Sequence, residues 1–154
     1  MTNTLLPIQA VARKLEIPEN ECGFAADLGA EKCFNIVMQQ SGIVPAAAVL
    51  VTTVRSIRNQ GEGDLERGLP TLGKHIEILK GFGVPAVAAV NRFSDDSESE
   101  LNRLAPYYAE RGVGSVLSEG FAKAGPGAKE LAEKVVATIR EKPFACRPRP
   151  VFFR

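Results

Sequence analysis

Residues 46–54 read AAAVLVTTV, a nearly continuous run of apolar and β-branched side chains that follows Pro45. This composition is typical of a strand that is buried on both faces of a parallel sheet, because neither of its faces meets water. The segment PAVAAVN at 85–91 repeats the pattern, and GSVLS at 114–118 is a shorter third case. We therefore expect central parallel strands that include residues 47–54, 85–91 and 114–118.

Segments with the apolar spacing of amphipathic helices alternate with these strands. They cover residues 64–81, 97–111 and 128–141, and the second opens with a Ser-x-x-Glu capping-box pattern at Ser97 and Glu100. Strands that alternate with helices of this length imply right-handed crossovers and helices packed on the sheet. The expected fold class is α/β, a three-layer Rossmann-like domain with a mostly parallel sheet and helices on its faces.

The length and composition of the chain indicate one soluble domain. It has 154 residues, of which 45% are hydrophobic and 24% are charged, and such chains normally bury a single core. Two more amphipathic helices are expected at 7–16 and 29–40. We expect an N-terminal helical segment at 1–20, the Rossmann-like domain at 21–142 and a C-terminal tail at 143–154.

Charge and hydropathy narrow the kinds of partner. The chain has 19 basic and 18 acidic residues, and only the tail at 147–154 carries a basic block, so nucleic acid is not indicated as a partner. The longest mostly apolar run, 44–54, is about half as long as a membrane span requires, and the N-terminus lacks the pattern of a signal peptide. No membrane partner is expected, and the expected location is the cytoplasm.

The cysteines and the single histidine do not form a metal-binding pattern. Cys22, Cys33 and Cys146 are odd in number and lack C-x-x-C spacing, and His75 has no second histidine to pair with. Neither a disulfide framework nor a zinc site is indicated, so we expect three reduced thiols and no metal. His75 lies inside a helical segment and is expected to be solvated or half-buried.

Ligands of parallel sheets bind beyond the carboxyl ends of the strands, which places the candidate site in the loops at 54–63, 91–96 and 118–127. Phe93 closely follows the second strand, and Phe121 closely follows the third. A planar ligand could stack on Phe93, or the ring could fold back under the next helix, and both interpretations stay open. Two rings at matching positions favour an aromatic slot.

The sequence has no phosphate-binding loop of a standard kind, since neither G-x-x-x-x-G-K-S/T nor G-x-G-x-x-G follows a strand. The nearest segment is AKAGPGAKE at 122–130, a glycine loop that opens a helix whose free N–H groups could hold an anion. Pro126 lies inside this loop, and no serine or threonine follows Lys129. A plain strand-to-helix turn is therefore favoured over an anion subsite.

Four segments, in their order along the chain, resemble one protein family. They are CGFAADLGAEKCFN at 22–35, AAVLVTTVRSIRNQG at 47–61, GLPTLGKHIEILKGFGVPAVAAVNRF at 68–93 and LSEGFAKAGPGAKELAEKVV at 117–136. They look like the middle segment of formate-tetrahydrofolate ligase, also called 10-formyltetrahydrofolate synthetase, over roughly residues 21–142. The opening LLPIQAVARKLEIPENE also resembles the N-terminus of that family.

The resemblance implies an ATP-dependent ligase of one-carbon metabolism. Members of the family join formate to tetrahydrofolate through a formyl phosphate intermediate, and they are several times longer than this chain. Their phosphate loop lies in a section that would fall between IPENE and CGFAAD, and a C-terminal section would stand where FACRPRPVFFR stands; neither is present. We expect a folate-side domain that is inactive in isolation, with ATP and tetrahydrofolate as substrates of the family and no covalently bound cofactor.

The resemblance also implies site residues, while the catalytic residues stay unassigned. The residues that match a folate clamp are Asn91, Phe93, Ser118, Glu119, Phe121 and Lys123. Phe121 falls where the family has tryptophan, so its smaller ring would stack less strongly on the folate. The residues that match a loop along the active-site cleft are Gly23, Phe24, Asp27 and Gly29, with Ala25 in place of a glycine.

Three functional interpretations stay open on the sequence. In the first, the chain keeps a clamp for a pterin or adenine ring, as part of a split ligase or as a remnant of one. In the second, it is a non-catalytic module that associates with a full-length ligase, with another protein or with itself through the apolar surface left by the missing sections. In the third, it is a generic Rossmann-like domain whose clamp has lost its ligand.

Overall fold

The computed structural model describes residues 30–41 and 45–141. The helix expected at 7–16 and the tail expected at 143–154 lie outside the described residues. Outside them too lie Cys22, Cys146 and the cleft-loop residues Gly23, Phe24, Asp27 and Gly29.

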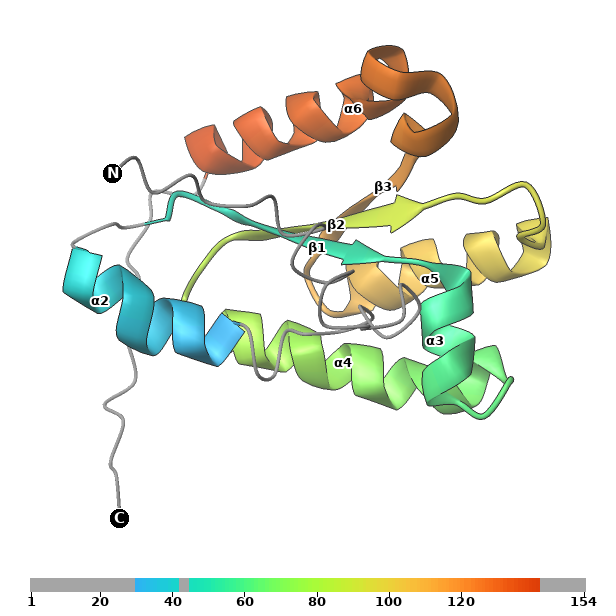
Figure 1. Cartoon of the computed structure of the whole chain (residues 1–154), viewed down its shortest axis with the longest axis horizontal. Helices are drawn as coiled ribbons and strands as arrows, with labels where there is room; N and C mark the ends of the chain where they lie inside the picture. The colour runs from blue at the N-terminus through green and yellow to red at the C-terminus, as the bar shows by residue number, and fades with distance from the viewer. Residues whose placement is uncertain (1–29, 42–44, 142–154) are drawn as a thin grey trace, which may run out of the picture.

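Three parallel strands form the sheet, in the order β1, β2, β3 (Figure 1). β1 is Ala48–Thr52, β2 is Ala86–Asn91 and β3 is Gly114–Ser118. The predicted parallel strands and the α/β fold class are confirmed. β1 is shorter than the expected strand at 47–54, because the chain turns into a helix directly after it.

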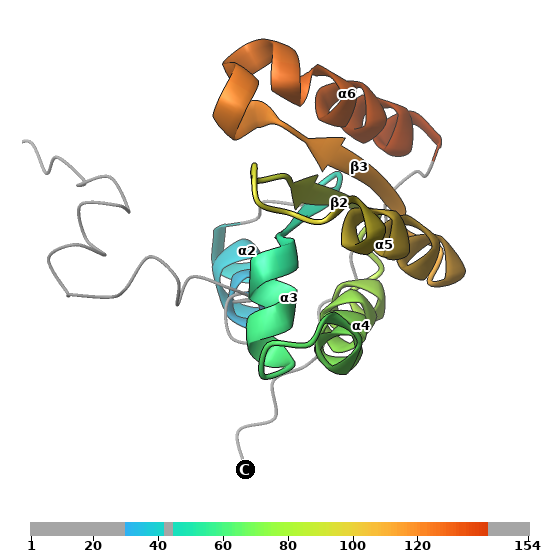
Figure 2. The ribbon, with the colours of Figure 1, turned by 90° about the vertical axis from the view of Figure 1, so that its right-hand side faces the viewer.

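Helices cover both faces of this sheet and give the domain three layers. They are η3 (Cys33–Val37), α2 (Met38–Ser41), α3 (Val54–Gln60), α4 (Leu65–Gly81), α5 (Glu98–Glu110) and α6 (Gly120–Glu141). In Figure 1, α6 lies on one face of the sheet and α4 and α5 lie on the other, and the turned view in Figure 2 agrees. η3 is a π-helical turn that continues into α2.

The main core lies between the sheet and helices α4 and α5. Leu50 of β1, Leu72 of α4 and Leu104 of α5 are buried there, and full burial of a side chain of this size contributes about 1.5–3 kcal/mol. His75 is 3% exposed, so the expectation of a solvated or half-buried histidine is wrong. His75 follows Leu72 by three positions and precedes Leu79 by four, which places all three on the buried face of α4.

The other face of β1 is open. Val49 and Val51 are 43% and 54% exposed, whereas Leu50 between them is buried. Among the described helices, α6 packs on β2 and β3 and does not cover these two valines. The prediction that this strand is buried on both faces is therefore wrong, because burial depends on which elements cover a sheet as well as on the composition of the strand.

Residues 54–63, expected as a loop, contain helix α3. A capping box fixes its start: the Ser56 N–H donates to Thr53 Oγ1 at 2.9 Å, and the Thr53 N–H donates to Ser56 Oγ at 3.2 Å. The usual capping box has Glu or Gln at the position that Ser56 takes here, so the standard pattern does not find it.

The capping box predicted at Ser97 and Glu100 does not form. α5 begins after Ser97 without a side-chain cap. The Ser97 hydroxyl is hydrogen-bonded to the Ser99 hydroxyl at 2.7 Å, and the Glu100 carboxylate accepts a hydrogen bond from Arg58 at 2.7 Å. Both side chains of the expected box are engaged elsewhere.

Candidate functional site

The ends of β2 and β3 bring two parts of the predicted clamp side by side. Asn91, the last residue of β2, is paired with Ser118, the last residue of β3. The Arg92 N–H donates to the Ser118 carbonyl oxygen at 2.9 Å, which extends the pairing by one residue beyond the strand. The loop that carries Phe93 therefore leaves the sheet beside the segment 119–123.

The loop after β2 holds Phe93 in a closed turn. The Phe93 N–H donates to the Asp96 carboxylate at 2.8 Å, and the Asp96 N–H donates to the Phe93 carbonyl oxygen at 3.2 Å. Aspartate side chains commonly close turns by accepting from a nearby backbone N–H. Arg92 forms an ion pair with Glu98 in the first turn of α5. Phe93 is partly exposed and is not among the buried core residues.

Arg55, in the first turn of α3, lies over the Phe93 ring. Its guanidinium carbon is 5.3 Å from the ring centroid, which is a cation–π arrangement. Its Nη2 donates a hydrogen bond to the Asp95 carboxylate at 2.9 Å. This hydrogen bond lowers the pKa of Asp95 and so favours its ionised form. One face of the Phe93 ring therefore contacts the Arg55 guanidinium, which is in turn paired with the Asp95 carboxylate.

Sequence reasoning missed Arg55 and Asp95 as site residues. The two are 40 positions apart, and a pair at that separation leaves no local pattern. The signal that could have found them is their location, because Arg55 lies in the loop expected at 54–63 and Asp95 in the loop at 91–96. Both segments follow strands on the edge where parallel sheets bind ligands.

The segment after β3 forms a tight turn that leads into α6. The Glu119 N–H donates to the Gly127 carbonyl oxygen at 3.3 Å, and a Cβ atom at Gly127 would lie 2.5 Å from the Glu119 carbonyl oxygen. α6 begins at Gly120, earlier than the expected residue 128, and breaks at Ala124, whose φ of 50° and ψ of −133° are not helical. The segment 118–127, expected as a loop, falls largely within α6.

The polar clamp residues at the end of β3 and after it are engaged in local hydrogen bonds. Ser118 is buried, and its Oγ accepts a hydrogen bond from the Gly120 N–H at 3.4 Å. The Glu119 carboxylate accepts a hydrogen bond from the Lys123 ammonium group at 2.5 Å, and this bond is the main reason that the pKa of Glu119 is lowered. The Phe121 side chain is not among the described side chains, so a pair of facing rings stays a prediction.

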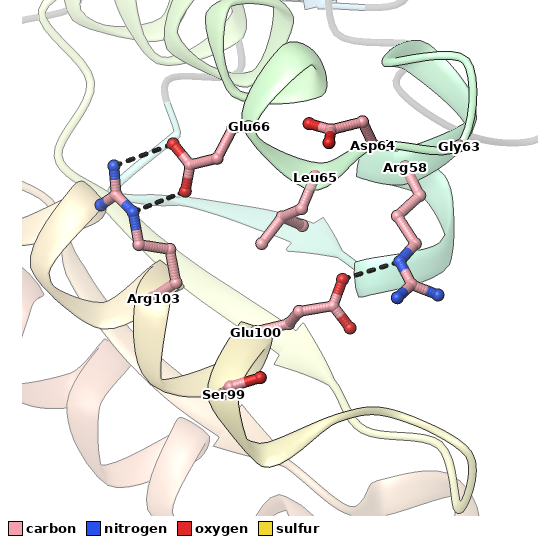
Figure 3. A pocket seen from close by; sticks show the side chains of 8 residues that line it. All are labelled: Arg58, Gly63, Asp64, Leu65, Glu66, Ser99, Glu100 and Arg103. Carbon is pink, nitrogen blue, oxygen red and sulfur yellow. Dashed lines mark hydrogen bonds and ion pairs between the residues drawn. The ribbon is translucent and has the colours of Figure 1, made fainter.

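A separate pocket of about 370 Å³ lies between the N-terminal ends of α4 and α5 (Figure 3). The residues that line it are Arg58, Gly63, Asp64, Leu65, Glu66, Ser99, Glu100 and Arg103. Arg58 is paired with Glu100 at 2.7 Å, and Arg103 is paired with Glu66 at 2.7 and 3.2 Å. Because these charges neutralise each other, the pocket is poorly suited to an anion. None of the predicted clamp residues lines it.

Two classes of feature are absent from the part of the chain that the structure describes. Over residues 30–41 and 45–141, no group of three or more His, Cys, Asp or Glu side chains is arranged to hold a metal ion. No helix within these ranges combines the length and the apolar character needed to cross a membrane. Cys33, the one cysteine within them, is a partly exposed free thiol.

A parallel sheet with helices on both faces defines an α/β protein, and aromatic and charged residues gather at the carboxyl ends of its strands. The family model of formate-tetrahydrofolate ligase matches residues 3–149. The chain belongs to the formate-tetrahydrofolate ligase family, and the resemblance seen in its sequence is confirmed.

Individual relatives agree with the family match. The formate-tetrahydrofolate ligase of Paracoccus denitrificans (strain Pd 1222) is 47% identical over 128 residues, which are 76% of this chain and 23% of the relative. That of Allorhizobium ampelinum is 40% identical over 146 residues, 88% of this chain and 26% of the relative. That of Ruegeria sp. (strain TM1040) is 38% identical over 148 residues, which are 89% of this chain and 26% of the relative. The chain thus spans about a quarter of the length of these relatives.

Proposed function

We propose that the chain supplies the folate-binding side of a formate-tetrahydrofolate ligase, a role in one-carbon metabolism. In this proposal the pterin ring of tetrahydrofolate stacks on Phe93, with Phe121 as the second ring of the clamp. Membership of the family supports the substrate class. The position of Phe93 supports the location of the site: the residue is partly exposed and lies beside the end of β3, in a loop that Asp96 closes.

The polar groups near Phe93 suit the edge of a reduced pterin, which carries both hydrogen-bond donors and acceptors. The amide of Asn91 and the hydroxyl of Ser118 can each donate and accept, and the two residues are strand partners. Glu119 and Lys123 add one ionised carboxylate and one ammonium group. Stacking on an aromatic ring contributes about 0.5–1.5 kcal/mol beyond the area it buries, so these polar groups would decide how the ligand is oriented.

The ATP-dependent step needs parts that these 154 residues do not contain. Phosphoryl transfer depends on donors arranged around the transferred group, and the sequence has no standard phosphate loop. The two arginines of the α4–α5 pocket are paired with glutamates, so they do not replace such a loop. We therefore infer that ligation requires a further section of polypeptide that carries the ATP site.

A second candidate function is a non-catalytic interaction module derived from the ligase. The exposure of Val49 and Val51 on β1 favours it, because two neighbouring β-branched residues on an uncovered sheet face provide apolar surface for a protein partner. Folate binding separates the two functions, since the interaction module needs none.

Calorimetric titration of tetrahydrofolate into the purified chain tests the proposal. We expect binding that Phe93→Ala and Phe121→Ala each weaken several-fold, and that Phe121→Trp restores or tightens. Equal affinities for the native chain and all three variants would disprove the folate site. Circular dichroism of each variant checks that the fold is intact.

A coupled assay tests the inferred lack of an ATP site. Without added protein, the chain is expected to give no formate-dependent ATP hydrolysis. Turnover by the chain alone at ordinary enzyme rates, about 1–1,000 per second, would contradict this expectation.

A further inference from the structure

Arg55 covers the ring that the proposed function assigns to the folate. Its guanidinium carbon is 5.3 Å from the centroid of Phe93, so the cation takes up space that a pterin stacked on that face would need. Guanidinium and pterin are both planar, and both bind the face of an aromatic ring. On this face of Phe93, the side chain and the ligand exclude each other.

Two contacts keep Arg55 in this position. Asp95, two residues after Phe93, accepts a hydrogen bond from Arg55 Nη2 at 2.9 Å. The capping box of Thr53 and Ser56 fixes the first turn of α3, from which Arg55 projects. The Arg55 and Asp95 side chains are each 66% exposed, so neither is held by surrounding packing, and Arg55 is able to swing into solvent.

We propose that Arg55 is a gate at the folate site and that Asp95 is its latch. In the free protein the guanidinium covers Phe93, and a pterin stacks on the ring only after Arg55 has left it. An exposed cation–π contact is weak, so the gate lowers the affinity for a stacked ligand by about two- to five-fold and does not block binding. This inference rests on the proposed folate site.

Substitutions on both sides of the contact test the gate, with calorimetric titration of tetrahydrofolate as the readout. Arg55→Ala is expected to bind tetrahydrofolate about two- to five-fold more tightly than the native chain. Asp95→Ala releases the latch and is expected to tighten binding to a smaller extent. The double variant is expected to bind no more tightly than Arg55→Ala, because Asp95 affects binding only through its hydrogen bond to Arg55.

Arg67 offers a matched control. It is an arginine of similar exposure, 65%, and it is paired with Glu62, another carboxylate on the surface. Arg67→Ala removes the same charge from the protein, so it reports any general electrostatic effect on an anionic folate. We expect its affinity for tetrahydrofolate to equal or fall below that of the native chain.

A second measurement examines the contact without any ligand. The ring current of Phe93 is expected to shift the NMR resonance of the Arg55 side-chain Nε–H, and Phe93→Leu is expected to remove that shift. An Arg55 resonance that Phe93→Leu leaves unchanged would overturn the gate, whatever the titrations give.

The titrations separate failure of the gate from failure of the folate site. If the native chain binds tetrahydrofolate and Arg55→Ala binds equally or more weakly, the gate is wrong and the site stands. If the native chain binds tetrahydrofolate and Arg55→Ala binds it about two- to five-fold more tightly, the gate is supported. If neither protein binds tetrahydrofolate, the proposed site is wrong and the gate falls with it.

Discussion

The hydroxyl groups of Thr52 and Tyr108 lie 2.7 Å apart in the protein interior, where they join the end of β1 to α5 across 56 positions of sequence. Both residues are buried. This hydrogen bond fixes the helix beneath the edge of the sheet at which the candidate site lies.

Removing both partners of this pair should cost less than the sum of the two single removals. Tyr108→Phe or Thr52→Val alone leaves a buried hydroxyl without a partner, and each is expected to lower the free energy of unfolding by about 1–3 kcal/mol. The double variant should cost less than the sum of the two, because no orphaned group remains. Urea denaturation of the four proteins measures this, and strictly additive costs would contradict it.

Tyrosine ionisation should occur at unusually high pH. Burial raises the pKa of Tyr108 to about 12, and burial also raises the pKa of Tyr107. The folded state holds these protons more tightly than the unfolded state does, so their contribution to stability is complete below pH ~10 and is lost as the pH rises towards 12. The chain has two tyrosines and no tryptophan, so tyrosinate absorbance reports these groups alone.

The expected result is a tyrosinate titration that lies above the range of free tyrosine, from which Tyr108→Phe removes the later part. Circular dichroism recorded on the same samples follows unfolding. If both phenols titrated like free tyrosine while the fold was still intact, the burial of Tyr108 would be disproved.

The Thr53 cap should contribute to stability where the Ser97 cap does not. Thr53→Ala removes the acceptor for the Ser56 N–H and is expected to lower the free energy of unfolding by about 1 kcal/mol. Ser97→Ala is the matched control, because Ser97 occupies the same position before α5 without capping it. Its effect is expected to stay within about 0.5 kcal/mol. Thermal melts of the two variants compare them directly, and equal losses would argue against the cap.

Gly68 should be intolerant of any side chain. A Cβ atom there would lie 1.9 Å from the Ile57 carbonyl oxygen, so alanine would force α3 and α4 apart. We expect Gly68→Ala to destabilise the protein by about 1–3 kcal/mol, the usual cost of overpacking. Gly125→Ala is the control, since a Cβ atom there meets nothing within 4 Å. Denaturant midpoints that are the same for both variants would contradict the close approach at Gly68.

The features that the sequence predicts well are local. The apolar runs of the three strands and the amphipathic spacing of α4 appear at the expected residues, and Asp64 caps α4 by accepting from the Arg67 N–H at 2.9 Å. Each of these patterns is set by neighbours within a few positions. The burial of His75 could likewise have been inferred from its spacing to Leu72 and Leu79.

The features that the sequence missed depend on contacts between distant segments. The capping pattern at Ser97 and Glu100 fails because Glu100 instead accepts a hydrogen bond from Arg58, a residue of α3. The contact of Arg55 with Phe93 likewise requires α3 to lie beside the loop after β2. Neither relationship has a signature within one segment, so only the folded chain reveals them.

The uncovered side of β1 has a practical consequence for work with the protein in solution. Among the described strands β1 pairs with β2 alone and is an edge strand, and its side chains Val49 and Val51 are largely exposed on the sheet face. Exposed borders of this kind recruit further strands, which leads to aggregation. The solubility limit of the chain should therefore be set by these two valines, and threonine at both positions, which keeps the β-branched shape, should raise the concentration at which light scattering begins.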